Sequence, residues 1–446
     1  MRRLLLLPLL VAASSYGHAA DFTAPQMTVS AFRQAEGVNT HLAYNDGAYA
    51  NVGKVIESLK YLGVDHVRDG VNSTWQFDSY KAAARAGVKI VAVVVGGGEL
   101  SYAENAPNAP SLSQRITYVD DLAQTAAGSV IAVEGPNEIN NFPVVYNGRG
   151  TSRTGSEELE VALALQRDLY RTVHEDTVLH GVPVFYFTGW AAGSIPLGPD
   201  PMTTPGLADF NNQHPYPKRA EPPGRWVSRR ENFPNQRNNA VLHPPAVFTE
   251  TGYTTKSGAP DVVSPETQAK YTLELLFDSA KGGISGTYLY ELLDAYAPNS
   301  SHSNDGYGLF DFRFHPKPVA VAIHNLNAIL GDAGDIAPAS ARSGLRYAVT
   351  GAAPTVNDIA LSAANGATVI VLWDESAANP GQAPPPPSPA TVELQDGGAN
   401  AAAAGGYTVL QYDPLKGSSP VATFANVKQV PVPHLDGPVL LVVKRP

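Results

Sequence analysis

IAVEGPNEINN, residues 131–141, combines a short buried strand with a polar turn. The apolar residues Ile131–Val133 favour a strand, a glycine and a proline end it, and Glu138 follows close to its carboxyl end. A second stretch, AVFTETGY at residues 246–253, has the same plan, with Glu250 after three apolar or aromatic residues. Each stretch therefore places a carboxylate at the tip of a buried strand.

Strands and helices alternate from about residue 36 to residue 335. Short apolar runs predict eight strands, at 38–43, 64–67, 89–95, 131–133, 183–188, 207–214, 247–249 and 286–290. Helical spacing of apolar residues, with caps and terminating glycines, predicts helices at 52–62, 80–86, 111–126, 154–173, 265–281 and 318–330. The sixth repeat, 217–240, has the weakest helical signal. Eight strand–helix repeats predict an α/β fold of the (β/α)8 TIM-barrel type. The alternative, an open doubly wound sheet, has no G-x-G-x-x-G turn to support its dinucleotide-binding form.

Composition changes at both ends of this barrel. Residues 1–20 have two arginines, an apolar core and small residues for cleavage, which predicts a signal peptide and a periplasmic or extracellular protein. The barrel is assigned to residues 21–335. Residues 340–446 have short β-forming runs separated by Gly, Pro and Asn, which predicts an antiparallel β-sandwich. No other apolar run approaches the length of a membrane span, so we expect no membrane association after cleavage.

The net charge of −10 argues against nucleic acid as a partner. Catalytic groups of TIM barrels lie at the carboxyl ends of the strands. By strand count Glu138 follows the fourth strand and Glu250 follows the seventh. Two carboxylates at such positions suit glycoside hydrolysis, in which one carboxyl group protonates the leaving oxygen and the other attacks the sugar or activates water. The expected partner is therefore a polysaccharide or oligosaccharide, with no cofactor and no metal.

The barrel resembles clan A retaining glycosidases, either family 5-like or family 39-like. The resemblance covers about 300 residues, extends to the β-domain, and depends on Asn137-Glu138 and on Glu250 in the sequence TETG. It implies that Glu138 is the general acid/base and Glu250 the nucleophile. Retention would require carboxyl groups about 5–5.5 Å apart.

The same resemblance implies roles for further residues. Arg68 would hydrogen-bond the nucleophile and keep it ionised, and Asn137 would bond the 2-hydroxyl of the sugar. In the sequence HPYP, Tyr216 would donate to Glu250 and His214 would line the cleft. His41, near the end of the first strand, is a further candidate for substrate binding.

The eighth strand departs from the clan pattern, which often ends this strand with tryptophan. Here Tyr290 stands in its place, followed by Glu291 as a possible hydroxyl ligand. Trp190 is an alternative stacking platform. This departure leaves the sugar and its linkage open.

Two other classes of function stay open at this point. A barrel that binds polysaccharide without cleaving it would not need both glutamates. A metal-dependent hydrolase would need His41, His214 and Asp294 to gather, but the sequence has no His-x-His or His-x-x-x-His spacing near a strand tip.

Overall fold

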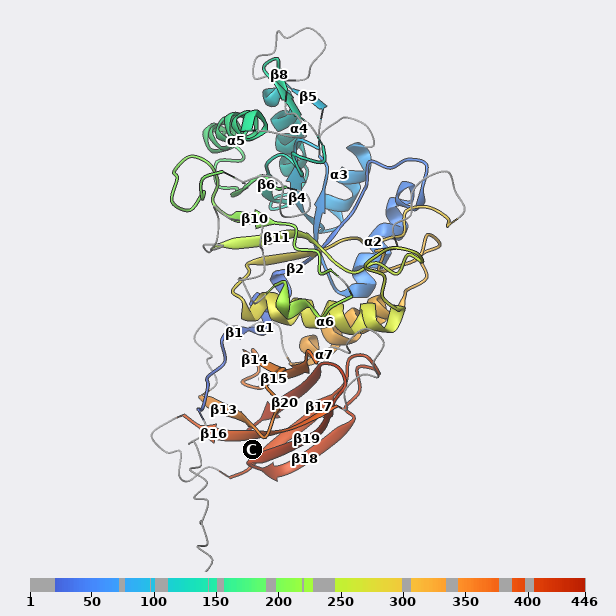
Figure 1. Ribbon diagram of the computed structural model, residues 1–446, viewed down its shortest axis with the longest axis vertical. Helices are drawn as coiled ribbons and strands as arrows, with labels where there is room; N and C mark the ends of the chain where they lie inside the picture. The colour runs from blue at the N-terminus through green and yellow to red at the C-terminus, as the bar shows by residue number, and fades with distance from the viewer. Residues whose placement is uncertain are drawn as a thin grey trace, which may run out of the picture.

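The computed structural model describes residues 21–71, 77–96, 98–100, 111–142, 144–150, 156–189, 198–218, 220–227, 245–298, 306–333, 344–376, 387–397 and 405–445. The predicted signal peptide and Trp190 lie outside these ranges. Within them, the chain forms a strand–helix domain with a β-domain stacked below it in Figure 1.

Eight parallel strands of the described chain form one sheet. In spatial order they are β10 (Asn211–Gln213), β11 (Ala246–Thr251), β12 (Gly286–Leu289), β2 (Glu36–Asn39), β3 (His66–Asp69), β4 (Lys89–Val93), β6 (Val130–Glu134) and β9 (Val184–Phe185). A parallel bridge between Phe185 and Phe210 joins β9 to the start of β10 and closes the sheet. The predicted (β/α)8 barrel is therefore confirmed, with one strand at each predicted position.

The barrel interior is packed with side chains from several of its strands. One buried cluster joins residues of β4, β6, β9, β11 and β12, namely Val91, Ala132, Phe185, Val247 and Tyr288. A filled interior leaves the carboxyl ends of the strands as the place where polar groups can meet.

The helices around the barrel are α2 (Val52–Leu62), α3 (Phe77–Arg85), α4 (Leu112–Thr125), α5 (Ser156–Glu175), α6 (Pro265–Lys281) and α7 (Pro318–Ala333). Helix α2 has the predicted ends because Asn51 accepts a hydrogen bond from the Lys54 N–H at 3.1 Å and Gly63 adopts φ of 76°. In the sixth repeat the described residues contain only the short 3-10 helix η2 (Pro223–Arg225), as its weak helical signal suggests.

Some short elements were not predicted. Helix α1 (Val29–Gln34) precedes β2, and the 3-10 helix η1 (Ala48–Ala50) follows it. The loops after β4 and β6 contribute a small sheet of β5 (Gly98–Leu100), β7 (Val144–Tyr146) and β8 (Arg149–Gly150). Figure 1 shows this small sheet at the end of the molecule farthest from the β-domain.

The C-terminal domain is the predicted antiparallel β-sandwich. Its strands are β13 (Leu345–Thr350), β14 (Val356–Ser362), β15 (Thr368–Asp374), β16 (Ser388–Asp396), β17 (Tyr407–Tyr412), β18 (Ala422–Val427), β19 (Gln429–Leu435) and β20 (Val439–Lys444). The sheet β14-β15-β20-β17-β18 faces the three-stranded sheet β13-β16-β19 across a buried apolar cluster.

The first described residues cross from the sandwich to the barrel. Strand β1 (Met27–Thr28) pairs in parallel with β14, and Thr23 forms a bridge with Tyr347. The predicted barrel range 21–335 therefore contains an N-terminal segment that completes a sandwich sheet. No local pattern marks this, because the pairing joins residues more than 300 positions apart.

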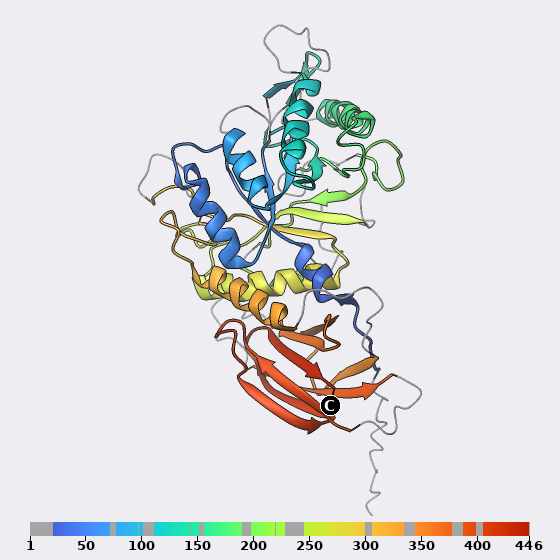
Figure 2. The same ribbon diagram turned by 180° about the vertical axis from the view of Figure 1, so that it is seen from behind.

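Helices α6 and α7 separate the barrel strands from the sandwich, as Figure 2 shows from behind. Phe277 of α6 packs against Trp373 of β15, with ring centroids 5.7 Å apart, and both side chains are buried. No helix in the described part of the chain is both long enough and apolar enough to cross a membrane.

Candidate active site

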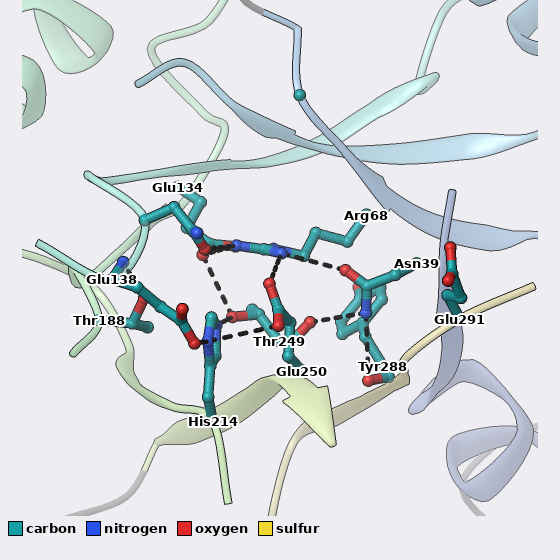
Figure 3. A network of polar contacts seen from close by, with 12 residues as sticks. Asn39, Arg68, Glu134, Glu138, Thr188, His214, Thr249, Glu250, Tyr288 and Glu291 are labelled. Atoms are coloured by element: carbon teal, nitrogen blue, oxygen red, sulfur yellow. Dashed lines mark hydrogen bonds and ion pairs between the residues drawn. The ribbon is translucent and has the colours of Figure 1, made fainter. Parts of the chain in front are cut away.

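The candidate site lies where the parallel strands of the barrel end. Arg68 lies on β3, Glu134 is the last residue of β6, Glu250 lies near the end of β11, and His214 directly follows β10. Figure 3 shows these side chains converging from different strands. Parallel strands present their carboxyl ends at the same rim, so groups distant in sequence meet there.

Glu250 is a buried carboxylate with a donor on each oxygen. Arg68 Nη1 donates to Oε1 at 2.5 Å, and the Tyr216 hydroxyl donates to Oε2 at 2.9 Å. Burial alone would raise the pKa of Glu250, but the charges of His214 and Arg68 and the hydrogen bonds from Tyr216 and Arg68 lower it overall. Glu250 is therefore held ionised.

Arg68 is buried in the barrel and has four hydrogen-bonding partners. Its Nε and Nη2 bind both oxygens of Glu134, at 2.8 and 2.7 Å. Its Nη1 also donates to Asn39 Oδ1 at 3.0 Å, and its Nη2 to Asn137 Oδ1 at 2.6 Å. Burial would lower the pKa of Arg68, but the charges of Glu134 and Glu250 raise it, so the guanidinium stays charged. Glu134 is therefore paired with an arginine inside the barrel.

Glu138 lies in the turn after β6 with φ of 43°. This left-handed conformation is uncommon for a residue other than glycine and is found mostly where surrounding contacts require it. The Glu138 N–H donates to the Thr188 hydroxyl at 3.0 Å, Oε1 lies 2.9 Å from His214 Nδ1, and Oε2 accepts from Asn141 Nδ2 at 3.1 Å. These contacts aim the carboxyl group at Glu250.

The two carboxylates face the same cavity. One ligand atom each of Glu138, His214 and Glu250 lies within 4.8 Å of the others. The cavity has a volume of about 630 Å³, and its walls include Arg68, Asn137, Tyr216 and Tyr290 as well as Glu138 and Glu250. The predicted arginine, asparagine and tyrosines therefore gather around the glutamate pair.

His41 and Glu291 form a separate pair at one wall. His41 lines the cavity, and its Nε2 lies 3.3 Å from Glu291 Oε2, which also accepts from the Tyr49 hydroxyl at 3.3 Å. Burial would lower the pKa of His41, but Glu291 and the charges of Asp69 and Glu250 raise it. Glu291 is not among the cavity-lining residues, so its place is behind His41 rather than against a ligand.

Tyr290 lines the cavity where the clan often has tryptophan. Its ring meets those of Tyr216 and Tyr307 edge-on, at centroid distances of 6.3 and 5.7 Å. Tyr44 and Phe142 also line the cavity and are 38% and 43% exposed, which leaves ring surface available to a ligand. Trp190, the other predicted platform, lies outside the described residues.

Several site residues were missed by the sequence reasoning. Asn39 ends β2 and bridges Arg68 to the β11 backbone, since its Nδ2 donates to the Thr249 carbonyl at 3.0 Å. The only sequence signal for Asn39 was its position at the end of a strand. Asn141 lies three residues after Glu138, a spacing that allows the contact within one turn.

The groups that could share a cation in this site already have protein partners. Among the described residues, Glu138, His214 and Glu250 are the group close enough to share an ion. Glu250 is paired with Arg68, and His214 with Glu138, so an ion there would have to replace these contacts. Asp294, considered as a ligand from sequence, is instead paired with Lys317 at 2.6 Å.

Comparison with known proteins identifies the fold. No protein-family model matches the sequence, and no curated protein matches it. A family 39 glycoside hydrolase from the gut symbiont Bacteroides cellulosilyticus WH2 superposes with a TM-score of 0.58 at 13% identity, covering 94% of this chain and 83% of that chain. The GH39 enzyme from Xanthomonas axonopodis pv. citri superposes with a TM-score of 0.54 at 15% identity, covering 98% of this chain and 100% of that chain. Over nearly its whole length, the chain therefore shares its fold with family 39 glycoside hydrolases, as the predicted resemblance implies.

Proposed function

We propose that the protein is an exported glycoside hydrolase that cleaves O-glycosidic bonds of a polysaccharide or oligosaccharide with retention of configuration. The observation that carries this proposal is the glutamate pair at the strand ends, with oxygens of Glu138 and Glu250 within 4.8 Å. Retaining enzymes have carboxyl groups about 5–5.5 Å apart, whereas inverting enzymes have them about 6.5–9.5 Å apart. The close approach favours retention.

The different surroundings of the two carboxylates support different roles. Glu250, held ionised by Arg68 and Tyr216, attacks the anomeric carbon and forms a glycosyl ester. Glu138, paired with His214 rather than with a guanidinium, gives a proton to the leaving oxygen. Glu138 then takes a proton from water, which attacks the ester and frees the sugar.

The cavity suits a carbohydrate. Asn137 accepts from Arg68 through its amide oxygen, which leaves its amide nitrogen as the donor for the 2-hydroxyl. His41 supplies a further polar group, and Tyr44 and Phe142 supply ring faces for a sugar to stack on. The mixture of aromatic and polar walls is typical of sugar sites.

The nucleophile can be tested by trapping. A panel of aryl glycosides would first identify the sugar. The matching 2-deoxy-2-fluoro glycoside with an activated leaving group should then label Glu250, as peptide mass spectrometry would show. Glu57→Gln is the control, since Glu57 is exposed on helix α2 and lies outside the cavity lining, and it should still be labelled at position 250.

Three other outcomes would count against the proposal. A label elsewhere would overturn the assignment of Glu250. Absence of turnover across the panel, with polysaccharide binding retained in Glu250→Gln, would indicate a non-catalytic binding barrel. Loss of activity with chelator would indicate a metal-dependent hydrolase. Export is tested separately, by sequencing the N-terminus of protein recovered from the periplasm or medium, which should begin near residue 21.

A further inference from the structure

The contacts of Thr249, the residue before Glu250, restrict where protons can lie in the site. The Thr249 hydroxyl lies 2.8 Å from Asn212 Oδ1, 3.2 Å from Glu134 Oε1 and 3.0 Å from His214 Nε2. A hydroxyl has one proton to donate and two lone pairs with which to accept. At most one of these three partners can receive the Thr249 proton.

Two of the three partners can only accept. Glu134 receives both arms of the Arg68 guanidinium and faces Thr249 as a carboxylate. The Asn212 amide has a fixed orientation, because its Nδ2 donates to the Tyr186 carbonyl at 3.1 Å and its Oδ1 therefore faces Thr249. The hydroxyl proton thus goes to one of these oxygens, and the contact with His214 uses a hydroxyl lone pair. Nε2 of His214 must then be the donor.

We propose that Thr249 is a positioning residue that fixes a proton on His214 Nε2, so that His214 Nδ1 and Glu138 share a single proton between them. The consequence of this proposal for catalysis rests on the proposed function. The His214 side chain is 1% exposed, so solvent does not compensate for a missing partner. With Nε2 committed to Thr249, the only ring position that can gain or lose the shared proton is Nδ1, 2.9 Å from Glu138 Oε1.

Charged and titratable groups on several elements face this pair. Glu250 Oε2 lies 3.7 Å from His214 Nδ1, and Tyr216 donates to the same oxygen. Arg68 and Glu134 form the paired charges behind Thr249, as Figure 3 shows. Since Arg68 offsets only one of the two carboxylates Glu134 and Glu250, a proton kept near His214 and Glu138 is electrostatically favourable.

The protonation pattern is measurable without any substrate. Nitrogen-15 NMR of histidine-labelled protein distinguishes protonated from bare ring nitrogens, and the His214→Gln spectrum assigns the resonances. Wild type should show a protonated Nε2. Thr249→Val, which keeps the shape but offers no acceptor, should move the proton to Nδ1 and leave Nε2 bare, because a buried N–H without an acceptor is unfavourable.

Two control variants isolate the hydroxyl. Thr249→Ser keeps it and should retain the wild-type pattern. Thr272→Val removes a buried hydroxyl from helix α6, outside the cavity lining, and it should not affect His214. A bare Nε2 in wild type, or an unchanged pattern in Thr249→Val, would overturn the proposal. If Thr249→Val fails to fold, the wild-type spectrum still decides.

Kinetics then link the proton to catalysis. With Nδ1–H pointing at it, Glu138 stays an ionised acceptor and cannot protonate a leaving group. Thr249→Val should therefore hydrolyse alkyl glycosides about 100-fold more slowly, the low end of general-acid catalysis. The 2,4-dinitrophenyl glycoside, whose leaving group needs no protonation, should react at the wild-type rate. Equal loss on both substrates would indicate a structural role only. If wild type cleaves no glycoside, the proposed function fails while the NMR result still stands.

Discussion

At the scale of the residue, the site is a set of paired charges whose partners decide their protonation. Arg68 is paired with Glu250 on one side and with Glu134 on the other, while His214 lies against Glu138. The planar guanidinium is matched to Glu134 by two parallel hydrogen bonds, which an ammonium group could not reproduce. Two glutamates in one cavity are thereby placed in different surroundings, as the proposed roles of acid and nucleophile require.

Tyr216→Phe should move the acid limb of the pH–rate profile to higher pH. The Tyr216 hydrogen bond is one of the interactions that hold the pKa of Glu250 below its usual value, so its loss raises that pKa. In the proposed mechanism Glu250 attacks only when ionised, so activity should disappear at a higher pH as the medium is acidified. The pH profile of kcat/KM measures this.

The same variant should also lower kcat on the order of 10-fold, the usual effect of losing one hydrogen bond to a charged group. Tyr296→Phe is the matched control, because Tyr296 donates to Asp46 outside the cavity lining. An acid limb that stays in place in Tyr216→Phe would show that Tyr216 does not act on Glu250.

At the scale of the element, the two ends of the barrel strands carry different kinds of residue. The carboxyl ends hold the charged network, whereas the amino end of β2 begins with Glu36, buried against α7. Glu36 Oε2 accepts from Asn327 Nδ2 at 2.9 Å. Burial raises the pKa of Glu36 to about 7, while the Asn327 hydrogen bond and the charge of Arg33 oppose this shift. Glu36 thus titrates near neutrality because the amino end of β2 is buried.

Glu36→Gln should remove a pH dependence of stability. Between about pH 4.5 and pH 7 the unfolded chain has lost a proton that folded Glu36 keeps, so the free energy of unfolding of wild type falls as pH rises through this window. At pH 8 the variant should be more stable than wild type by up to about 3 kcal/mol, and at pH 4 the two should be equal. Denaturant unfolding at several pH values measures the difference.

Glu57→Gln, at an exposed position of α2, is the matched control for Glu36→Gln. Its side chain is 66% exposed, so Glu57→Gln should leave the pH dependence of wild type intact. A Glu36→Gln variant with the wild-type pH dependence would mean that Glu36 is ionised in the folded protein at neutral pH.

At the scale of the whole molecule, barrel and sandwich are joined by a continuous core. One buried cluster runs from the barrel helices into the sandwich and includes Phe277, Trp373, Leu440 and Val442. Polar contacts add to it, such as Asn325 Nδ2 donating to the Pro414 carbonyl at 2.9 Å. The sandwich therefore contributes to the stability of the barrel, whether or not it contacts substrate.

Trp373→Ala should destabilise both domains together. Trp373 is fully buried at the junction, and removal of a buried tryptophan side chain costs about 3–5 kcal/mol. Circular dichroism and residual activity should be lost in one transition at lower denaturant than in wild type. Val421→Ala, at a position 52% exposed on the sandwich, should change stability by less than about 0.5 kcal/mol. Loss of sandwich signal with barrel activity retained would show that the domains unfold independently.

Much of this architecture follows from local sequence patterns. The (β/α)8 count, the trailing sandwich and the ends of α2 were predicted from apolar spacing, caps and glycines, which act between residues close in the chain. Glu138 and Glu250 were found because each follows an apolar run. The predicted positions of Arg68, Asn137, His214 and Tyr216 came from resemblance, and the structure brings all four to the glutamate pair.

The pairing of charges was decided only by the tertiary structure. Arg68 and Glu250 are 182 positions apart, and Glu134 and Thr249 are 115 apart, so no local rule links them. The same holds for β1, which joins a sandwich strand far along the chain. Sequence by itself determined which groups stand at strand tips, because that depends on neighbouring residues. Closure of the barrel determined which of those groups form hydrogen bonds and ion pairs with one another, because only closure brings distant strand ends within hydrogen-bonding distance.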